Sequence, residues 1–496
     1  MELLVKNKYF ILPTPKYIKI QKENGITLSS LLTIFLNKYR IKDNALLLSS
    51  KFNKHFNTFL NAIPIRDSDL DENWGENYFF TIITPESIYE TKIKRDLNVL
   101  IENYIRQFEN ILNECCYELY PERLKSSLPL DESYYINISN GAIWIISSSA
   151  RGFYYGIQTI IQIIEHTLFL FDKFEEFITL PEMQIVDFPG WIFRGINVDL
   201  NCFKPTIEAL TNLVPFLMKY KFNNISLVHK SEFPYSQENQ IKIQDLCEFH
   251  QIEFKDITEL RLLDTKKLHL VKNCTKGGLF LPDYKKILSS ISDLELDQVN
   301  KNGITVGIGG RVPLDLQILI LPIIGELLWN PHFPLNMDFW KHSTNCAQIS
   351  LFETNLLKNI DNFFDVFQSF INSSSTHDFI CPVLEDLKTS AFENTHLIEA
   401  LNWALKGRKL ESDLLKLKEG ISHKNIENLS VNEILKLKDY SNNYYELIDQ
   451  GTRIFENSNH LEKGKFLKCV YSSDFTLKLL VESWIPTMLE NHTSGA

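Results

Sequence analysis

The apolar and polar residues between 188 and 236 follow two different periods. The run from Ile192 to Leu200 is short and mostly apolar, which is typical of a strand buried on both faces. The next run, Thr206 to Tyr220, carries an apolar stripe at the spacing of a helix. A second apolar run, Asn224 to His229, follows it, so the order predicts the strand, helix and strand of a parallel α/β unit. The stripe consists of Ile207, Leu210, Val214 and Leu217.

Residues 1 to about 185 have the mixed pattern of an α+β domain. Short apolar runs predict strands at Tyr9–Leu12, Ala45–Ser49 and Tyr78–Ile83. Lys92–Cys116 instead has apolar residues three and four positions apart, which predicts a long helix.

Two β-rich runs, Tyr134–Asn140 and Gly141–Ser147, meet at an Asn-Gly step. Both residues of such a step readily adopt the left-handed conformation that a two-residue turn requires, so we predict an antiparallel hairpin. The following segment, ARGFYYGIQTIIQIIEH, predicts a helix because its apolar residues share one helical face. These are Phe153, Ile157, Ile160, Ile161 and Ile164.

The second half of the chain predicts one more strand and then helices. Ile304–Ile308 is a short apolar run bounded by glycines, which is typical of a buried strand. The segment LDLQILILPIIGELLW predicts a helix that stops at Asn330-Pro331. Long helical stretches beyond about residue 350 predict a helical bundle: Leu351–Ile371, Ile398–Leu417, Val431–Phe455 and Asp474–Glu490. We therefore predict three domains, at residues 1–185, 186–345 and 346–496.

The composition is that of an ordinary globular protein, with 44% hydrophobic and 23% charged residues among 496. The net charge of −11 argues against nucleic acid and anionic membranes as partners, because both require clustered positive charge. The eight cysteines are scattered without a CxxC pair, so we expect no metal site, no disulfide framework and no cofactor. The amino terminus lacks the features of a secretory signal, and no apolar run could span a membrane, so we expect a cytoplasmic location.

Two phrases resemble glycoside hydrolase family 20, the β-N-acetylhexosaminidases. The stretch Phe188–Ser236 resembles the opening of the family's catalytic barrel. The helix predicted before it resembles the end of the small α/β domain that precedes this barrel. The matching residues are Gly152, Tyr155, Gly156, Gln158, Thr159 and Gln162. The WNP phrase at Trp329 and the helices after it are also similar to family 84, whose enzymes remove N-acetylglucosamine from proteins.

The resemblance implies an α+β amino-terminal domain, a (β/α)8-type barrel and a carboxyl-terminal helical domain. A barrel of this type usually needs about 250 residues. The segment from Arg194 to Trp329 has room for about four or five strand–helix units. We therefore predict an α/β protein with a shortened TIM-like barrel at residues 186–345.

The acid pair that both families use is missing from the chain. These enzymes use the substrate's acetamido group as the nucleophile, while one carboxylate orients this group and a neighbouring one protonates the leaving oxygen. The resemblance implies a GGDE phrase or an Asp-Asp pair, and the chain contains neither. Its two Asp-Glu steps, at Asp71-Glu72 and Asp131-Glu132, fall in predicted polar turns. One alternating group of acids is more typical of a solvated face: Asp293, Glu295 and Asp297.

Three residues of the first two barrel strands are candidates for substrate binding. Arg194 matches the family arginine that bonds sugar hydroxyls, or else it forms a structural salt bridge. Asp199 matches the acid at the end of strand one, where the functional face of a barrel lies, or else it orients neighbouring loops. His229 lies near the family's strand-two histidines, or else it is a packing residue.

The resemblance thus implies a hexosaminidase-like protein that recognises N-acetylhexosamine glycans or glycoconjugates, with hydrolysis impaired or lost. Two alternatives stay open. One is an active β-N-acetylglucosaminidase with relocated carboxylates, and the other is a non-enzymatic interaction protein that works through its helical bundle. The sequence leaves the oligomeric state open.

Overall fold

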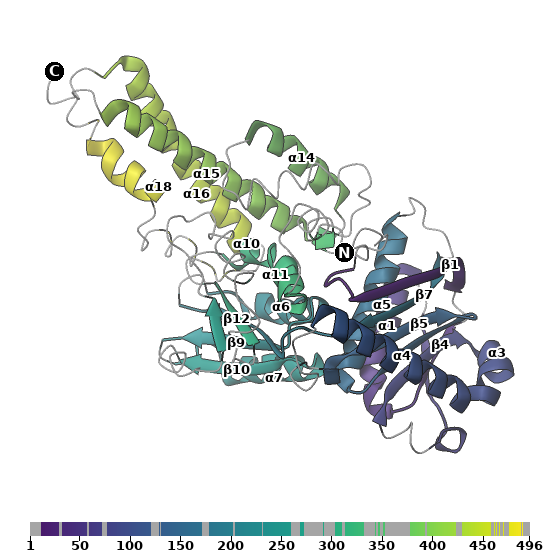
Figure 1. Ribbon diagram of the computed structural model, residues 1–496. Helices are drawn as coiled ribbons and strands as arrows, with labels where there is room; N and C mark the ends of the chain where they lie inside the picture. The colour runs from purple at the N-terminus through teal and green to yellow at the C-terminus, as the bar shows by residue number, and fades with distance from the viewer. Residues whose placement is uncertain are drawn as a thin grey trace. The chain divides into compact units, whose positions relative to one another are not determined.

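The computed structural model spans residues 1–496 and is shown in Figure 1. It describes residues 11–28, 32–56, 59–71, 77–120, 128, 130–170, 178–201, 204–230, 232–258, 268–271, 291, 303–309, 313–331, 343, 346–347, 351–352, 377–391, 394–422, 429–457, 461, 463, 466, 470, 476–487 and 489. The chain divides into two compact units. The first comprises Met1–Arg194, Phe216–Asn223 and Pro322–Leu357, and the second comprises Gly195–Pro215, Asn224–Leu321 and Lys358–Ala496. The three predicted domains stay a prediction.

The first unit contains a seven-stranded sheet in the order β1-β7-β5-β6-β4-β2-β3. Neighbouring strands are antiparallel except β2 and β3, which are parallel. The strands are β1 (Tyr17–Leu28), β2 (Leu32–Leu36), β3 (Asn61–Pro64), β4 (Phe79–Pro85), β5 (Tyr134–Ser139), β6 (Ala142–Ser147) and β7 (Ile178–Asp187). The prediction of a strand near Tyr78–Ile83 is confirmed by β4.

Helices pack on both faces of this sheet (Figure 1). α4 (Leu97–Leu119) forms a core with one face, where the ring of Tyr104 packs 5.0 Å from that of Trp144. α5 (Ala150–Leu170) lies on the other face, so close that a Cβ on Gly156 would lie 2.6 Å from Ile145. Consecutive strand residues point to opposite sides of a sheet. Because β5 and β6 carry consecutive buried residues, both faces of the sheet are covered.

The predicted hairpin and the helix after it are confirmed. Ser139 of β5 pairs with Ala142 of β6, which leaves Asn140 and Gly141 as a two-residue turn. Their φ angles of 54° and 76° are both left-handed, as such a turn requires.

Two strand predictions in this unit are wrong. Ala45–Ser49 lies inside helix α1 (Lys42–Phe56), where Ala45, Leu48 and Phe52 are buried at helical spacing. A short apolar run alone does not distinguish a strand from one face of a helix. Ile11 and Leu12 are not in a strand, and the rest of Tyr9–Leu12 lies outside the described residues.

The second unit contains a five-stranded sheet in the order β10-β9-β8-β12-β11. The strands are β8 (Phe193–Asp199), β9 (Asn224–His229), β10 (Glu253–Thr258), β11 (Leu268–Val271) and β12 (Gly303–Gly309). β8, β9 and β10 are mutually parallel, as are β11 and β12. The connections are helices α6 (Ile207–Lys219) and α7 (Gln237–Phe249). The strand–helix–strand unit predicted for residues 188–236 is therefore confirmed as β8, α6 and β9.

The mixed α/β class is confirmed, but a shortened barrel is not. In the part of the chain that the structure describes, β10 and β11 are the two edges of the sheet, and the sheet does not close. The predicted strand at Ile304–Ile308 is confirmed as β12, which lies between β8 and β11.

Helices dominate the described residues after β12. The helix predicted up to Asn330 is divided into α10 (Leu314–Ile318) and α11 (Leu321–Trp329). The later helices are α14 (His377–Ser390), α15 (Thr395–Ser422), α16 (Val431–Asn457), α18 (Thr476–Leu479) and the π-helical turn η9 (Leu480–Trp484). α15 and α16 pack side by side through buried residues such as Trp403, whose indole N–H donates to the carbonyl of Leu447 at 2.7 Å. Of the predicted helix Leu351–Ile371, only its first two residues lie within the described part.

Among the described helices, none combines the length and the apolar composition needed to cross a bilayer.

Candidate functional site

The carboxyl ends of three parallel strands of the second unit bring polar side chains together. Asp199 ends β8, His229 ends β9, and Asp256 lies two residues before the end of β10. Catalytic and binding residues of parallel α/β folds are found at this edge, where the strand ends and the following loops meet. It is therefore the first place in the described structure to look for a site.

His229 and Asp256 form a close pair. Nε2 of His229 lies 2.5 Å from Oδ1 of Asp256, and Nε2 of Gln240 donates to the other carboxylate oxygen at 3.4 Å. An imidazole that gives its Nε2 proton to a carboxylate keeps a lone pair on Nδ1. This Nδ1 is buried and has no hydrogen-bond partner among the described residues. His229 thus has one ring nitrogen bonded to Asp256 and one buried ring nitrogen without a hydrogen-bond partner.

Aromatic rings lie next to this pair. The ring of Phe233 packs edge-on against the His229 imidazole at 5.6 Å, and Tyr235 packs against Phe233 at 5.7 Å. The Tyr235 hydroxyl donates to the carbonyl of Pro205 at 2.6 Å, and the Lys204 ammonium lies 4.5 Å from the ring centre. The loop after β9 is held in place by these contacts.

Asp199 reaches the same edge but points to the other face of the sheet. It pairs in register with Val228, whereas Asp256 pairs with Leu227, one position earlier. Because strand side chains alternate between faces, Asp199 and Asp256 project in opposite directions. The half-buried Asp199 carboxylate accepts from the backbone N and the Nδ2 of Asn201, at 2.9 and 2.7 Å. The structure therefore joins His229 to Asp256 and separates both from Asp199.

Arg194 lies at the opposite end of β8, in the first unit, and only 1% of its surface is exposed. A guanidinium has five N–H donors, and all five are used internally. The acceptors are the carbonyls of Lys221 (2.9 Å), Trp191 (2.5 Å) and Ile192 (3.3 Å), Oε2 of Glu132 (2.5 Å) and the hydroxyl of Tyr155 (2.8 Å). Of the two roles considered for Arg194, these contacts favour the structural salt bridge.

The partner of this salt bridge, Glu132, is the glutamate of one of the two Asp-Glu steps. Its other carboxylate oxygen accepts from Arg151 at 2.8 Å. Burial alone would raise the pKa of the Glu132 carboxyl, but the charges and hydrogen bonds of Arg194 and Arg151 lower it. Of the other acids considered from the sequence, Glu72, Asp293, Glu295 and Asp297 lie outside the described residues.

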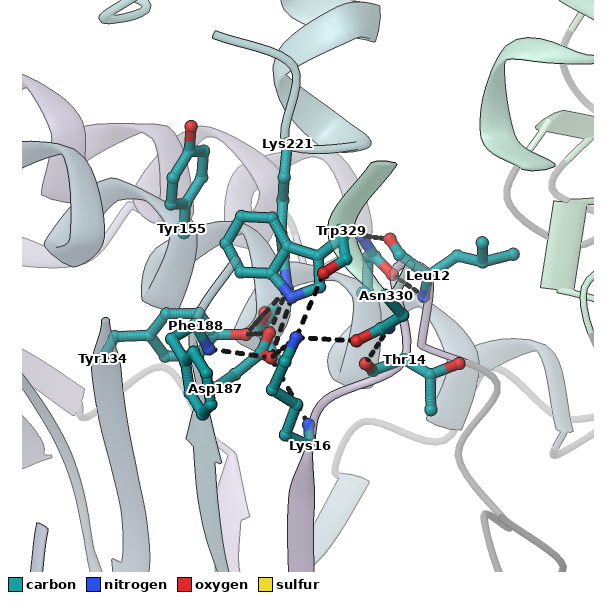
Figure 2. A network of polar contacts seen from close by, with 12 residues as sticks. Leu12, Thr14, Lys16, Tyr134, Tyr155, Asp187, Phe188, Lys221, Trp329 and Asn330 are labelled. Atoms are coloured by element: carbon teal, nitrogen blue, oxygen red, sulfur yellow. Dashed lines mark hydrogen bonds and ion pairs between the residues drawn. The ribbon is translucent and has the colours of Figure 1, made fainter. Parts of the chain in front are cut away.

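A second buried polar network of the first unit surrounds Asp187, the last residue of β7 (Figure 2). Oδ2 of its carboxylate accepts from Lys221 at 2.6 Å and from Tyr134 at 2.8 Å, and Oδ1 accepts from the indole of Trp329 at 2.8 Å. The ammonium of Lys16 lies 3.9 Å from Oδ1. Burial lowers the pKa of Lys16 to about 8, although the charge of Asp187 opposes this shift.

The indole of Trp329 connects the two networks. The cationic groups of Lys221, Arg194 and Lys16 lie 4.4, 4.9 and 5.6 Å from its ring. Such cation–π contacts stabilise buried positive charge. Family-like phrases contain Tyr155, Arg194 and Trp329, but no motif joins the members into one cluster, because they come from positions 16 to 329. Every charged group in it has a partner, so we assign it to folding.

Known families share part of this architecture. Residues 85–188 match the model of glycosyl hydrolase family 20, domain 2. The match includes Glu132, Tyr134, Tyr155 and Asp187 of the two buried networks. Residues 85–188 are thus similar to the second domain of glycosyl hydrolase family 20. A curated relative, a beta-hexosaminidase of Porphyromonas gingivalis, is 26% identical over 99 residues, which are 20% of this chain and 13% of the relative.

Solved structures show weaker, broader similarity. A family 20 exo-β-N-acetylglucosaminidase of Vibrio harveyi, in complex with N-acetylglucosamine, is 13% identical with a TM-score of 0.31, over 57% of this chain and 38% of that one. The structure of CpGH84D is 9% identical with a TM-score of 0.43, over 96% of this chain and 100% of that one. The chain spans well under two thirds of the family 20 relatives that it matches.

Proposed function

We propose that this family 20-like chain recognises glycans containing N-acetylhexosamine at the carboxyl edge of β8, β9 and β10, and that it hydrolyses them slowly or not at all. The relation to family 20 and the beta-hexosaminidase relative support the class of ligand. The site consists of His229, Asp256 and the loop that carries Phe233 and Tyr235.

The proposal that hydrolysis is lost rests on the placement of the carboxylates. Substrate-assisted hydrolysis requires two carboxylates that reach one sugar unit from the same side, one for the acetamido group and one for the leaving oxygen. At the described edge, Asp199 and Asp256 project from opposite faces of the sheet. Glu132 is buried and already bonded to two arginines. Each of these three described acids is therefore poorly placed to form the pair.

Recognition makes smaller demands on the same edge. A sugar offers hydroxyl and amide donors together with an apolar C–H face. The Asp256 carboxylate is one-third exposed and can accept from a sugar hydroxyl, and among the described residues its second oxygen accepts only the long contact from Gln240. The rings of Phe233 and Tyr235 supply apolar surface beside them.

Two measurements on the full chain test this function together. We expect calorimetry to detect binding of N-acetylglucosamine, and we expect Asp256→Asn to weaken it about tenfold, the loss of one charged hydrogen bond. Glu248→Gln, an exposed change on α7, serves as the control and should bind as the wild type does. Turnover of p-nitrophenyl N-acetyl-β-glucosaminide should not exceed the uncatalysed rate. Turnover that disappears in Asp256→Asn would establish an active enzyme, and no binding at all would remove the recognition role.

A further inference from the structure

A polar groove runs along the helical part of the second unit, away from the sheet residues described above. One hollow of about 310 Å³ lies where α14, α15 and α16 meet, and a second of about 300 Å³ lies between α15 and α16. Both volumes are at the lower end of those that bind small molecules. The hollows share Lys406 and Gln450, so they lie next to one another, and we refer to the two together as the groove.

The floor of the groove belongs to the helical core. Trp403, Leu410 and Leu447 line it, but they are at least nine-tenths buried. These three side chains therefore leave little apolar surface for a partner to cover, and the apolar surface that is exposed comes from half-buried wall residues such as Tyr440 and Ile454. An amphipathic helix that docks in a groove needs apolar pockets for its own stripe, so a helical partner is poorly matched.

The walls carry charges of both signs and amides. Glu385 and Lys406 line the first hollow, and Asp413 and Lys409 line the second. Lys388 of α14 and Glu399 of α15 already neutralise one another at 2.6 Å. The acidic wall residues would repel a polyanion, and the lysines would repel a polycation. The groove therefore matches an uncharged partner that both donates and accepts hydrogen bonds along its length.

We propose that this groove binds a neutral oligosaccharide. Hydroxyl groups donate to carboxylates and amide oxygens and accept from ammonium groups, so one chain of sugars satisfies both kinds of wall residue. From Glu399 to Asp413 the groove follows α15 for about 20 Å, which is room for more than one sugar ring. The inference rests on the proposed function for the class of ligand, and it places a second, separate contact on the helices.

Calorimetry of the full chain with N,N′,N″-triacetylchitotriose tests the groove. The double variant Lys406→Met with Gln450→Leu removes the two side chains that both hollows share. We expect it to bind the trimer about tenfold more weakly, as expected for the loss of two hydrogen bonds. The control is Lys416→Met with Asn442→Leu, two exposed changes on the same helices outside the groove, and it should bind as the wild type does. Hydrogen exchange should show trimer-dependent protection at residues 398–413 and 440–454.

The outcomes separate this inference from the proposed function. Equal affinity of the wild type and the groove variant, or no binding of the trimer, would overturn the groove. If N-acetylglucosamine binding is lost in Asp256→Asn while the groove variant leaves the trimer unaffected, the sheet edge is a site and the groove is not. If the groove variant weakens binding of the trimer and N-acetylglucosamine does not bind, the groove is a site and the sheet edge is not.

Discussion

The ammonium of Lys221 lies 2.6 Å from Oδ2 of Asp187, and neither side chain is accessible to solvent. Lys221 also has a φ of 61°, a left-handed conformation that residues with a Cβ seldom adopt. The turn after α6 therefore has an uncommon backbone conformation, and it places the Lys221 ammonium beside the end of β7. Asp187 balances this charge, and it also accepts from Tyr134 and Trp329.

Removing the charge of Asp187 should destabilise the first unit strongly. Asp187→Asn leaves Lys16 and Lys221 buried without their shared counterion. Breaking a buried ion pair in this way costs about 3–5 kcal/mol. Urea unfolding followed by tryptophan fluorescence should show the loss as a lower midpoint.

Glu102→Gln is the matched control for this change. It removes one partner of an exposed pair with Arg106 in the same unit and should cost less than about 1 kcal/mol. A similar midpoint for Asp187→Asn and Glu102→Gln would contradict the assigned role of the network.

Arg194 should behave as a folding residue and not as a sugar ligand. Arg194→Lys keeps the charge but replaces a five-donor fork with a single ammonium, so several buried acceptors lose their partner. We expect a loss of about 3 kcal/mol in the free energy of unfolding. The affinity of the folded variant for N-acetylglucosamine should stay at the wild-type value, as calorimetry below the unfolding transition can determine. Wild-type stability with sugar binding abolished would restore the role in substrate binding.

Local pattern predicted the elements of the fold where period and turn chemistry agree. β9 was predicted to the residue, because its apolar run is bounded by polar residues, and the Asn140-Gly141 turn defined the hairpin. α1 was missed because the apolar run at Ala45–Ser49 is too short to show a helical period. β1 and β7 were missed as well. Their pairing joins residues far apart in sequence, so no local pattern reveals it.

The candidate site was harder to predict for the same reason. His229 was singled out because it lies near the strand-two histidines of family 20, but its partner Asp256 lies one strand further on and carries no motif. Strand register, which the sequence does not reveal, decides that Asp256 joins His229 and that Asp199 does not. For Arg194 the sequence left two roles open, and only the count of bonded donors favours one of them.

Glu165 should make the protein sensitive to acid. Burial by itself would raise the pKa of this carboxyl, but Lys219 and Lys51 at 3.2 and 2.8 Å lower it to about 2, against an ordinary value of 4.5. A carboxyl whose folded pKa is depressed stabilises the protein above the unfolded pKa, and this stability is lost as the pH falls toward the folded value. Between pH 5 and about 2 we expect a loss on the order of 2 kcal/mol from this group.

Glu165→Gln tests this source of acid sensitivity. The variant should be less stable than the wild type at pH 7, and the difference should shrink as the pH approaches 3. Parallel urea titrations of both proteins across this range would measure how the free energy of unfolding of each changes with pH. A difference that stays constant with pH would assign the acid sensitivity to other carboxyls.

Two glycines should respond to alanine with opposite signs. Gly141 has a φ of 76° in the hairpin turn, and an added Cβ would lie 3.1 Å from Ile88, so Gly141→Ala should cost about 1–2 kcal/mol. Gly420 lies exposed within α15 with no atom within 4 Å of an added Cβ. There alanine only lowers the conformational entropy of the unfolded chain, so Gly420→Ala should stabilise the folded protein by about 0.5–1 kcal/mol. Urea midpoints of the two variants measure both effects, and a destabilising Gly420→Ala would mean that α15 needs its glycine for a reason other than space.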